Sequence, residues 1–203
     1  MRKIRKILFT FLLLSFVFTL GTAISQKNQL QESVIRLHVV ADSDSVQDQQ
    51  IKLQVRDALT SKLESVMERM PDLETAKTYL QEQLPELERI ANDVLVRAGN
   101  SCRAVVSLAQ EAFSTRAYDT FSLPAGVYES LRVTIGSGEG RNWWCVVFPT
   151  LCVSATADGF EDTAAGAGFS DQLTDTLTGK PQYRVRFFIL DCLGRMENWF
   201  YSK

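Results

Sequence analysis

The strongest hydrophobic signal in the chain lies at its N-terminus. Residues 7–20 are apolar apart from two threonines and one serine, with four basic residues just before them and Gly21-Thr22-Ala23 just after. A basic start, a short apolar stretch and small residues at a cleavage point are the three parts of a secretory signal. A spanning helix needs roughly 20 apolar residues, and extension to Ile24 brings this run close to that length. The pattern therefore predicts export, with residues 1–23 as a signal peptide and an uncleaved anchor as the open alternative.

A strand and a helix start are predicted next, after a short polar tether over residues 24–33. Residues 34–41 are dense in β-branched side chains and end at a polar cluster, which is typical of a strand that runs into a helix N-terminus. Ser45 with Asp48 three positions later has the spacing of a capping box.

Three helices are expected after this cap. Apolar residues recur at three- and four-residue steps over residues 51–70, as on one face of a helix, and Pro71 ends the pattern. A second helix is predicted over residues 73–84. A third begins at Pro85, which is tolerated best at a first helical position, and ends at Gly99.

The hydrophobic period then shortens to two residues, which indicates strands. They are expected at residues 102–108, 128–135, 143–148 and 183–190. The glycine-rich run 136–140 predicts an antiparallel hairpin between the second and third of them. Residues 153–182, rich in Ala, Gly and Thr, are predicted to be a mobile acidic surface insert with a short helix at 172–177. The order favours one α+β domain over residues 34–203, with helices on one face of a largely antiparallel sheet.

Charge and cysteine content narrow the choice of partners. Without residues 1–23 the chain has 18 basic and 24 acidic side chains, a net charge of −6. Such a chain is a poor candidate for binding nucleic acid or an anionic membrane surface. All four cysteines lie in the part expected to be exported, where disulfides form, and a single histidine argues against a zinc site of the usual Cys/His kind.

His38 is the only histidine, so any acid–base chemistry of the usual kind depends on it. With Asp42 and Asp44 it gives one possible function, an extracytoplasmic hydrolase in which a His–Asp pair activates a nucleophile. The other interpretation is a strand histidine that is hydrogen-bonded beside a capping loop. The second is favoured, because no nucleophile lies in an elbow such as G-x-S-x-G.

Neither a metal nor a cofactor is predicted. Asp42 and Asp44 alternate like the first positions of a calcium loop, but the glycine and the distal glutamate of that loop are missing. A helix cap explains the same cluster. The glycine run 136–140 precedes a strand, whereas a phosphate-binding loop precedes a helix.

Trp143 and Trp144 are adjacent, so on a strand they point to opposite faces. One of them can enter the core. The other, near Arg132 and Arg141, has the composition of an interface hot spot. A packing role and a binding role both stay open for this pair.

Three stretches of the chain carry a family resemblance. They are I-R-L-H-V-V-A-D-S-D-S-V-Q-D-Q-Q-I-K-L-Q-V-R-D-A-L (Ile35–Leu59), S-T-R-A-Y (Ser114–Tyr118) and L-P-A-G-V-Y-E-S-L-R-V-T-I-G-S-G-E-G-R-N-W-W-C-V-V-F-P-T-L-C (Leu123–Cys152). Together they resemble the stage II sporulation protein R family over roughly a third of the chain. The run W-W-C-V-V-F-P-T-L-C is the most specific of these motifs, and Asp42 departs from the family pattern, where Asn is expected.

The resemblance implies a signalling role. Members are made in the forespore and exported into the space between the forespore and mother-cell membranes. There they activate a membrane-embedded aspartic protease that processes the pro-form of the mother-cell sigma factor E. The chain is then a protein ligand and not an enzyme, and it meets the membrane only through its partner or an uncleaved signal.

The surface that such a partner would contact is predicted to combine the loop Asp42–Asp48 with the Trp143–Trp144 pair. The polar and aromatic residues of the same motifs complete it: His38, Asp42, Asp44, Asp48, Arg56, Asp57, Arg116, Tyr118, Arg132, Trp143 and Trp144.

A disulfide between Cys145 and Cys152 is predicted, because the two are close in sequence with Pro149 between them to turn the chain. Closing so short a loop stabilises the fold by roughly 2–3 kcal/mol in the chain-entropy model. Cys102 and Cys192 form the remaining pair. Peptide mapping without reductant is expected to recover a Cys145–Cys152 cross-link, and two free thiols at these positions would refute it.

Overall fold

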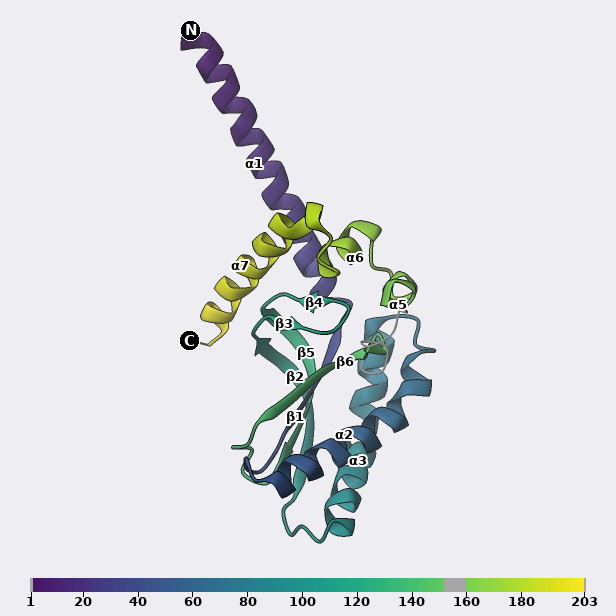
Figure 1. Cartoon of the computed structure of the whole chain (residues 1–203). Helices are drawn as coiled ribbons and strands as arrows, with labels where there is room; N and C mark the ends of the chain where they lie inside the picture. The colour runs from purple at the N-terminus through teal and green to yellow at the C-terminus, as the bar shows by residue number, and fades with distance from the viewer. Residues whose placement is uncertain (1, 152–159, 203) are drawn as a thin grey trace.

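The computed structural model describes residues 2–151 and 160–202, which form a four-stranded sheet with helices packed on it (Figure 1). This architecture confirms the α+β class. The elements are α1 (Arg2–Gln31), β1 (Ile35–Val40), α2 (Val46–Met67), α3 (Leu73–Arg97), β2 (Ala104–Phe113), β3 (Arg116–Ala117), β4 (Ser122–Leu123), β5 (Gly126–Ile135), β6 (Asn142–Phe148), α5 (Phe160–Gly166), α6 (Asp171–Leu177), a 3₁₀ turn η1 (Pro181–Tyr183) and α7 (Arg184–Tyr201).

The sheet is built around β1, whose six residues are all buried. The strand order is β2-β5-β1-β6, with β1 parallel to β5 and antiparallel to β6, and with β2 antiparallel to β5. The sheet is therefore mixed. The predicted hairpin between β5 and β6 is wrong, because β1 lies between them. A strand that is covered on both faces belongs at the centre of a sheet, and β1 takes that place.

The glycine run 136–140 carries the chain from β5 over the end of β1 to β6. Gly136 and Gly138 have φ values of 57° and 66°, which favour glycine. The N–H of Gly140 donates to the Ala41 carbonyl at 3.0 Å. A Cβ at Gly140 would lie 2.3 Å from the Ser43 carbonyl oxygen, so only glycine permits this close crossing.

Helices α2 and α3 cover one face of the sheet and build the larger core. Ser45 caps α2 as predicted, since its Oγ accepts the N–H of Asp48 at 3.0 Å. α3 continues through Pro85, so the prediction of two separate helices at this point is wrong. Leu80 and Leu87, on either side of Pro85, are both fully buried in this core. That burial offsets the roughly 3 kcal/mol that an interior proline costs a helix.

A second core contains residues of α1, α5, α6 and α7 together with side chains of the sheet. Residues 160–177 belong to the predicted mobile insert, but they form α5 and α6, with Phe160 and Leu173 buried. The prediction is wrong for this part, because these apolar side chains are covered by the second core. The short helix expected at 172–177 is confirmed by α6. Residues 152–159 of that region lie outside the described residues.

The predicted last strand, residues 183–190, instead begins the 18-residue helix α7. Alternation of apolar and polar residues there covers only eight positions. The buried residues Leu190, Asp191 and Gly194 have the three- and four-residue spacing of one helix face. Gly194 permits close packing, since a Cβ there would lie 1.6 Å from the Ala125 carbonyl oxygen.

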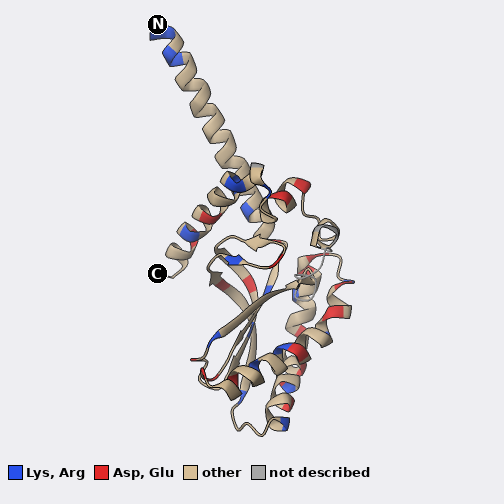
Figure 2. Ribbon diagram, viewed as in Figure 1, with Lys and Arg blue, Asp and Glu red and all other residues tan. Residues whose placement is uncertain are grey.

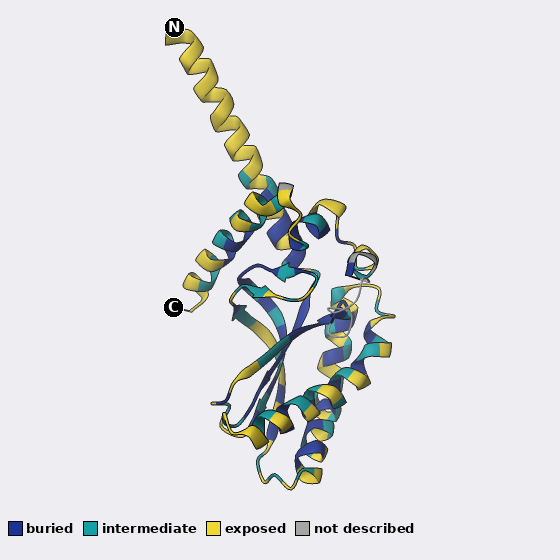
Figure 3. Ribbon diagram, viewed as in Figure 1, coloured by how far each residue is buried: buried dark blue, intermediate teal, exposed yellow. Residues whose placement is uncertain are grey.

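α1 runs without a break into the domain, so the predicted tether over residues 24–33 is wrong. Ala23 and Leu30 are buried, and Lys27 Nζ lies 2.9 Å from Glu197 Oε1 of α7. These contacts keep residues 23–31 of α1, which we call its foot, helical and packed against the domain. Residues 2–19 of the same helix are exposed (Figure 3). Among the described residues, α1 is the one helix long and apolar enough to cross a membrane. It is compatible with a signal sequence.

The structure tests one of the two predicted disulfides. Cys102 and Cys192 are both free thiols, so their predicted pairing is wrong. The sulfur of Cys102 lies 3.4 Å from Asp42 Oδ2, near the start of β2, whereas Asn198 of α7 bonds the Phe113 carbonyl at the other end of that strand. Two cysteines this far apart cannot be bridged. Cys152 lies outside the described residues, so its pairing with Cys145 stays a prediction.

Gly194→Ala is expected to destabilise the domain, although alanine normally favours a helix by about 1 kcal/mol over glycine. The new methyl group would collide with the Ala125 carbonyl, and overpacking of this kind costs about 1–3 kcal/mol. Thermal melting of the full chain in a mild detergent measures the change. Gly166→Ala is the control, because nothing lies within 4 Å of its added Cβ. Equal melting of the two variants would contradict the close contact between α7 and Ala125.

Candidate functional site

The candidate site lies on the face of the sheet opposite α2 and α3, which we call the second face. Leu37 and Val39 of β1 enter the larger core. Arg36 and His38 therefore point to the second face, because successive strand residues alternate. The polar and aromatic side chains gathered there come from four strands: His38, Glu111, Ser130, Arg132, Asn142 and Trp144.

Glu111 of β2 is the centre of this cluster. Its carboxylate lies 2.9 Å from His38 Nδ1 and accepts from Ser130 Oγ at 2.9 Å and from Arg132 Nη1 at 2.6 Å. Burial raises the pKa of this carboxyl. The hydrogen bond and charge of His38, with help from Ser130 and Arg132, outweigh burial and lower the pKa below its ordinary value. Glu111 thus stays ionised and links three strands of the sheet.

His38 lies between two oxygen acceptors. Its Nδ1 faces Glu111, and its Nε2 lies 2.8 Å from Asn142 Oδ1. An imidazolium donates to both oxygens. A neutral ring fits when Asn142 turns its amide and donates to Nε2. In either state His38 is 6% exposed, so the ring is a buried part of the cluster and not a solvent-facing base.

Trp144 extends the cluster outward through a stack of planar groups. The Trp144 ring stacks on His38 with centroids 5.5 Å apart and planes at 19°. The Arg116 guanidinium from β3 lies 3.5 Å from the Trp144 ring centroid on the Trp144 side of the stack. Such a cation–π contact contributes about 0.5–2 kcal/mol. The stack places a half-buried aromatic ring and an arginine at the surface of the second face.

Arg36 lies under this surface and is fully buried. Its guanidinium lies 4.0 Å from the Phe113 ring and 5.2 Å from the Tyr128 ring, and Nη2 donates to Tyr118 Oη at 3.3 Å. Aromatic faces thus surround the Arg36 charge. Tyr118, which was predicted to contact the partner, holds the β3–β4 hairpin over Arg36 through this bond, and its contact with a partner stays a prediction.

The carboxylates of the loop Asp42–Asp48 make hydrogen bonds to nearby groups of the domain. Asp42 Oδ1 accepts the N–H of Ser137 at 2.6 Å, and this bond lowers the pKa of Asp42. Asp44 accepts the N–H of Arg141 at 2.7 Å, and the Asp48 carboxylate accepts from the hydroxyl of Ser45, the N-cap of α2, at 2.8 Å. The three carboxylates therefore hold the β5–β6 crossing and the helix start in place. Asp44 is the most open to solvent, with 62% of its side chain exposed.

Trp143 points to the opposite side from Trp144, as predicted for adjacent strand residues. It packs against the larger core, and the Arg56 guanidinium of α2 lies 4.2 Å from its ring centroid. Arg56 also pairs with Asp57 at 2.5 Å. The predicted partner residues Arg56, Asp57 and Trp143 are thus separated by the sheet from His38 and Trp144.

The structure does not form the pair of His38 with Asp42 or Asp44 on which the hydrolase alternative depends. His38 is bonded to Glu111 and Asn142, whereas Asp42 and Asp44 bond the turn that follows β5. Strand direction explains this separation, because Asp42 and Asp44 lie beyond the end of β1 while His38 is in its middle.

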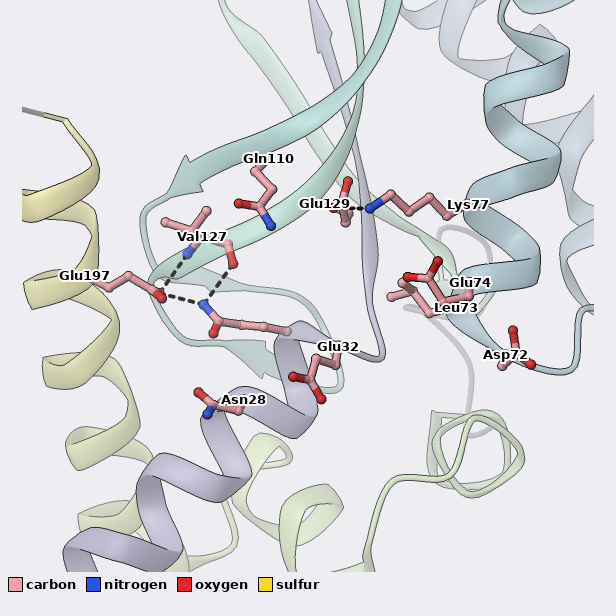
Figure 4. Close-up of a pocket in the computed structure, with 11 residues that line it drawn as sticks. Asn28, Glu32, Asp72, Leu73, Glu74, Lys77, Gln110, Val127, Glu129 and Glu197 are labelled. Atoms are coloured by element: carbon pink, nitrogen blue, oxygen red, sulfur yellow. Dashed lines mark hydrogen bonds and ion pairs between the residues drawn. The ribbon is translucent and has the colours of Figure 1, made fainter.

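A cavity of about 820 Å³ lies beside the foot of α1, between α3, α7 and the ends of β2 and β5 (Figure 4). Lys77 Nζ bonds Glu129 at 2.7 Å across one wall, and this bond raises the pKa of Lys77. Gln31 Nε2 bonds both Glu197, at 2.6 Å, and the Val127 carbonyl, at 2.8 Å. Glu32 and Glu74 add further negative charge to the lining.

Sequence reasoning missed Glu111, Ser130 and Asn142. The available signal was a glutamate that is the one charged residue of its strand. Only the register of β2 on β5, which pairs Gln110 with Glu129 and Ala109 with Ser130, brings Glu111 to His38.

These observations define an α+β domain carried behind an apolar N-terminal helix, with a polar and aromatic cluster on one face of its sheet. The stage II sporulation protein R family matches residues 31–158, and the chain belongs to this family. It is also similar to stage II sporulation protein R of Bacillus subtilis (strain 168), with 32% identity over 169 residues that cover 79% of this chain and 75% of the relative. No solved structure matches the chain.

Glu111→Gln is expected to lower the free energy of unfolding by about 1–3 kcal/mol at pH 6, because it removes the charge that His38 and Arg132 bond. The folded-state pKa of Glu111 is lowered. Its stabilisation is therefore present above the unfolded pKa of about 4.3 and is lost as pH falls through the folded value. Denaturant unfolding at pH 6 and pH 3 measures the difference, with exposed Glu82→Gln of α3 as the control. An equal loss at both pH values would refute a role for the Glu111 charge.

Proposed function

We propose that this chain is a signalling ligand of sporulation that activates a membrane-embedded aspartic protease and thereby promotes processing of the pro-form of the mother-cell sigma factor E. Membership of the stage II sporulation protein R family carries this proposal. The apolar helix α1 supports it, because a chain of this kind is delivered to or across a membrane. The chain acts on its partner by binding and not by catalysis, on the far side of the membrane in which the protease lies.

The surface read by the protease is, in this proposal, the second face around Trp144 together with the loop Asp42–Asp48. The two regions are continuous. Arg141 and Asn142 are neighbours at the start of β6, and they bond Asp44 and His38 respectively. An aromatic ring and an arginine set among ordered polar groups have the composition of an interface hot spot.

Rigidity also favours this surface. Glu111 and Asn142 hold His38, and His38 in turn supports the Trp144 ring from below. A preorganised contact loses less conformational entropy on binding than a flexible one. A signal must be read at low concentration, so a rigid binding surface suits the role.

Co-expression of the full chain with the protease and its proprotein substrate tests the activation itself. Cleavage is expected only when all three are present. Equal cleavage without this chain would remove the proposal.

A matched pair of arginine variants tests which face of the sheet contacts the protease. Arg116 lies over Trp144 on the second face, and Arg56 lies over Trp143 on the helix side. Arg116→Ala is expected to reduce cleavage at least about tenfold, since loss of a hot-spot residue costs about 2 kcal/mol or more of binding. Arg56→Ala is expected to retain cleavage, and both variants are expected to melt within a few degrees of wild type.

Trp144→Ala and Asp44→Ala extend the same experiment. Both are expected to lose cleavage, whereas Trp143→Ala is expected to lose stability, toward the roughly 3–5 kcal/mol typical of a buried aromatic side chain. Loss of cleavage with Arg56→Ala but not with Arg116→Ala would place the interface on the helix side of the sheet.

A further inference from the structure

The outward side of α7 is apolar along most of its length. More than half of the surface of four side chains on it is exposed: Val185 (71%), Phe188 (66%), Met196 (58%) and Phe200 (66%). The inner side of the same helix carries the fully buried Leu190 together with the buried Asp191. A surface helix normally turns a polar side to water. A contiguous exposed apolar stripe therefore indicates contact with something other than water.

Acidic and basic residues of α7 differ in their contacts and exposure. Both acidic residues, Asp191 and Glu197, are bonded within the domain, to Arg195 at 2.8 Å and to Lys27 at 2.9 Å respectively. Arg184 and Arg195 are exposed, and the side chain of Arg195 is 68% exposed although it pairs with Asp191. Figure 2 shows basic and acidic positions along the α7 ribbon. The outward side thus combines apolar and positively charged groups. That is the composition of helices that lie on anionic bilayers.

The position of α7 identifies the bilayer concerned. α7 packs against the foot of α1, and Lys27, Gln31 and Glu197 join the two helices. Figure 1 shows that α7 begins beside the packed part of α1 and runs from there to the C-terminus on the domain side, away from the exposed end of α1. When the exposed part of α1 crosses a bilayer, α7 is held close to that membrane, because it is bonded to Lys27 and Gln31 just beyond the exposed part.

We propose that α7 is an interfacial helix that holds the domain against the membrane that α1 enters. Its apolar stripe lies among the lipid acyl chains, and Arg184 and Arg195 meet anionic headgroups. The net charge of −6 on the domain does not prevent this contact, because charges more than about 8–10 Å away are largely screened at physiological ionic strength. This inference does not depend on the identity of the protease.

The full chain in vesicles that contain anionic lipid tests the proposal through Trp199, which lies near the C-terminal end of α7. Bromine atoms on lipid acyl chains quench tryptophan fluorescence on contact. An interfacial helix inserts about 5–10 Å into the headgroup and acyl boundary, so shallow bromines are expected to lower the Trp199 emission about twofold. Subtraction of the Trp199→Phe spectrum isolates this residue from Trp143 and Trp144.

The double variant Val185→Ser/Phe188→Ser is expected to abolish this quenching while it melts like wild type, because both side chains lie outside the core. Val105→Ser is the matched control, since Val105 is a similarly exposed valine (53%) on β2. It is expected to leave the quenching unchanged. Quenching that persists in the double variant would contradict a role for the stripe.

Unchanged Trp199 emission in brominated vesicles overturns the proposal. Oxidative cross-linking through the free thiol of Cys192 on α7 gives an independent readout. A cross-link between two copies, together with unquenched Trp199, would assign the stripe to self-association. Quenching without a cross-link supports the membrane contact.

Discussion

The pairing of β1 with β5 on one side and β6 on the other is the constraint on which the rest of the structure depends. β1 is buried over all six residues, so each of its faces must be covered. Leu37 and Val39 supply the core under α2 and α3, while Arg36 and His38 supply the base of the second face. A shift of one residue would exchange these sets, because side chains alternate along a strand. The same pairing therefore fixes both the hydrophobic core and the candidate binding surface.

The second face is a polar cluster that holds strands of the sheet together, and in the proposed function it is also the binding surface. Glu111 joins β1, β2 and β5 through three hydrogen-bonded side chains. This network orients His38, which supports Trp144, which in turn carries Arg116. His38 is buried, whereas Trp144 and Arg116 are half-buried. A rigid base with an aromatic and cationic surface suits recognition of another protein better than catalysis, since His38 itself is buried.

The N-terminal helix and the C-terminal helix contact each other at one place on the domain. The foot of α1 and the inner side of α7 are joined by Lys27, Gln31 and Glu197, beside the acidic cavity. If α1 enters a bilayer and α7 lies on its surface, the domain has a restricted orientation toward that membrane. A protease embedded in a membrane presents its exposed loops close to the lipid surface. Attachment by two helices would raise the effective concentration of the ligand there.

What the sequence alone determined was local. A run of β-branched residues predicted β1, hydrophobic periodicity predicted α2, and the apolar run after a basic start predicted the export segment. The spacing of Ser45 and Asp48 predicted the cap, and the motifs identified the family. Contacts between distant segments decided the rest. Insertion of β1 between β5 and β6 and the convergence of Glu111 on His38 depend on strand register. α7 is a helix because Gly194 and Leu190 pack on the domain, an effect that a short alternation of apolar and polar residues cannot reveal. A local pattern indicates whether a segment prefers the hydrophobic period of a helix or that of a strand. The residues against which each buried side chain packs are determined only when the whole chain folds.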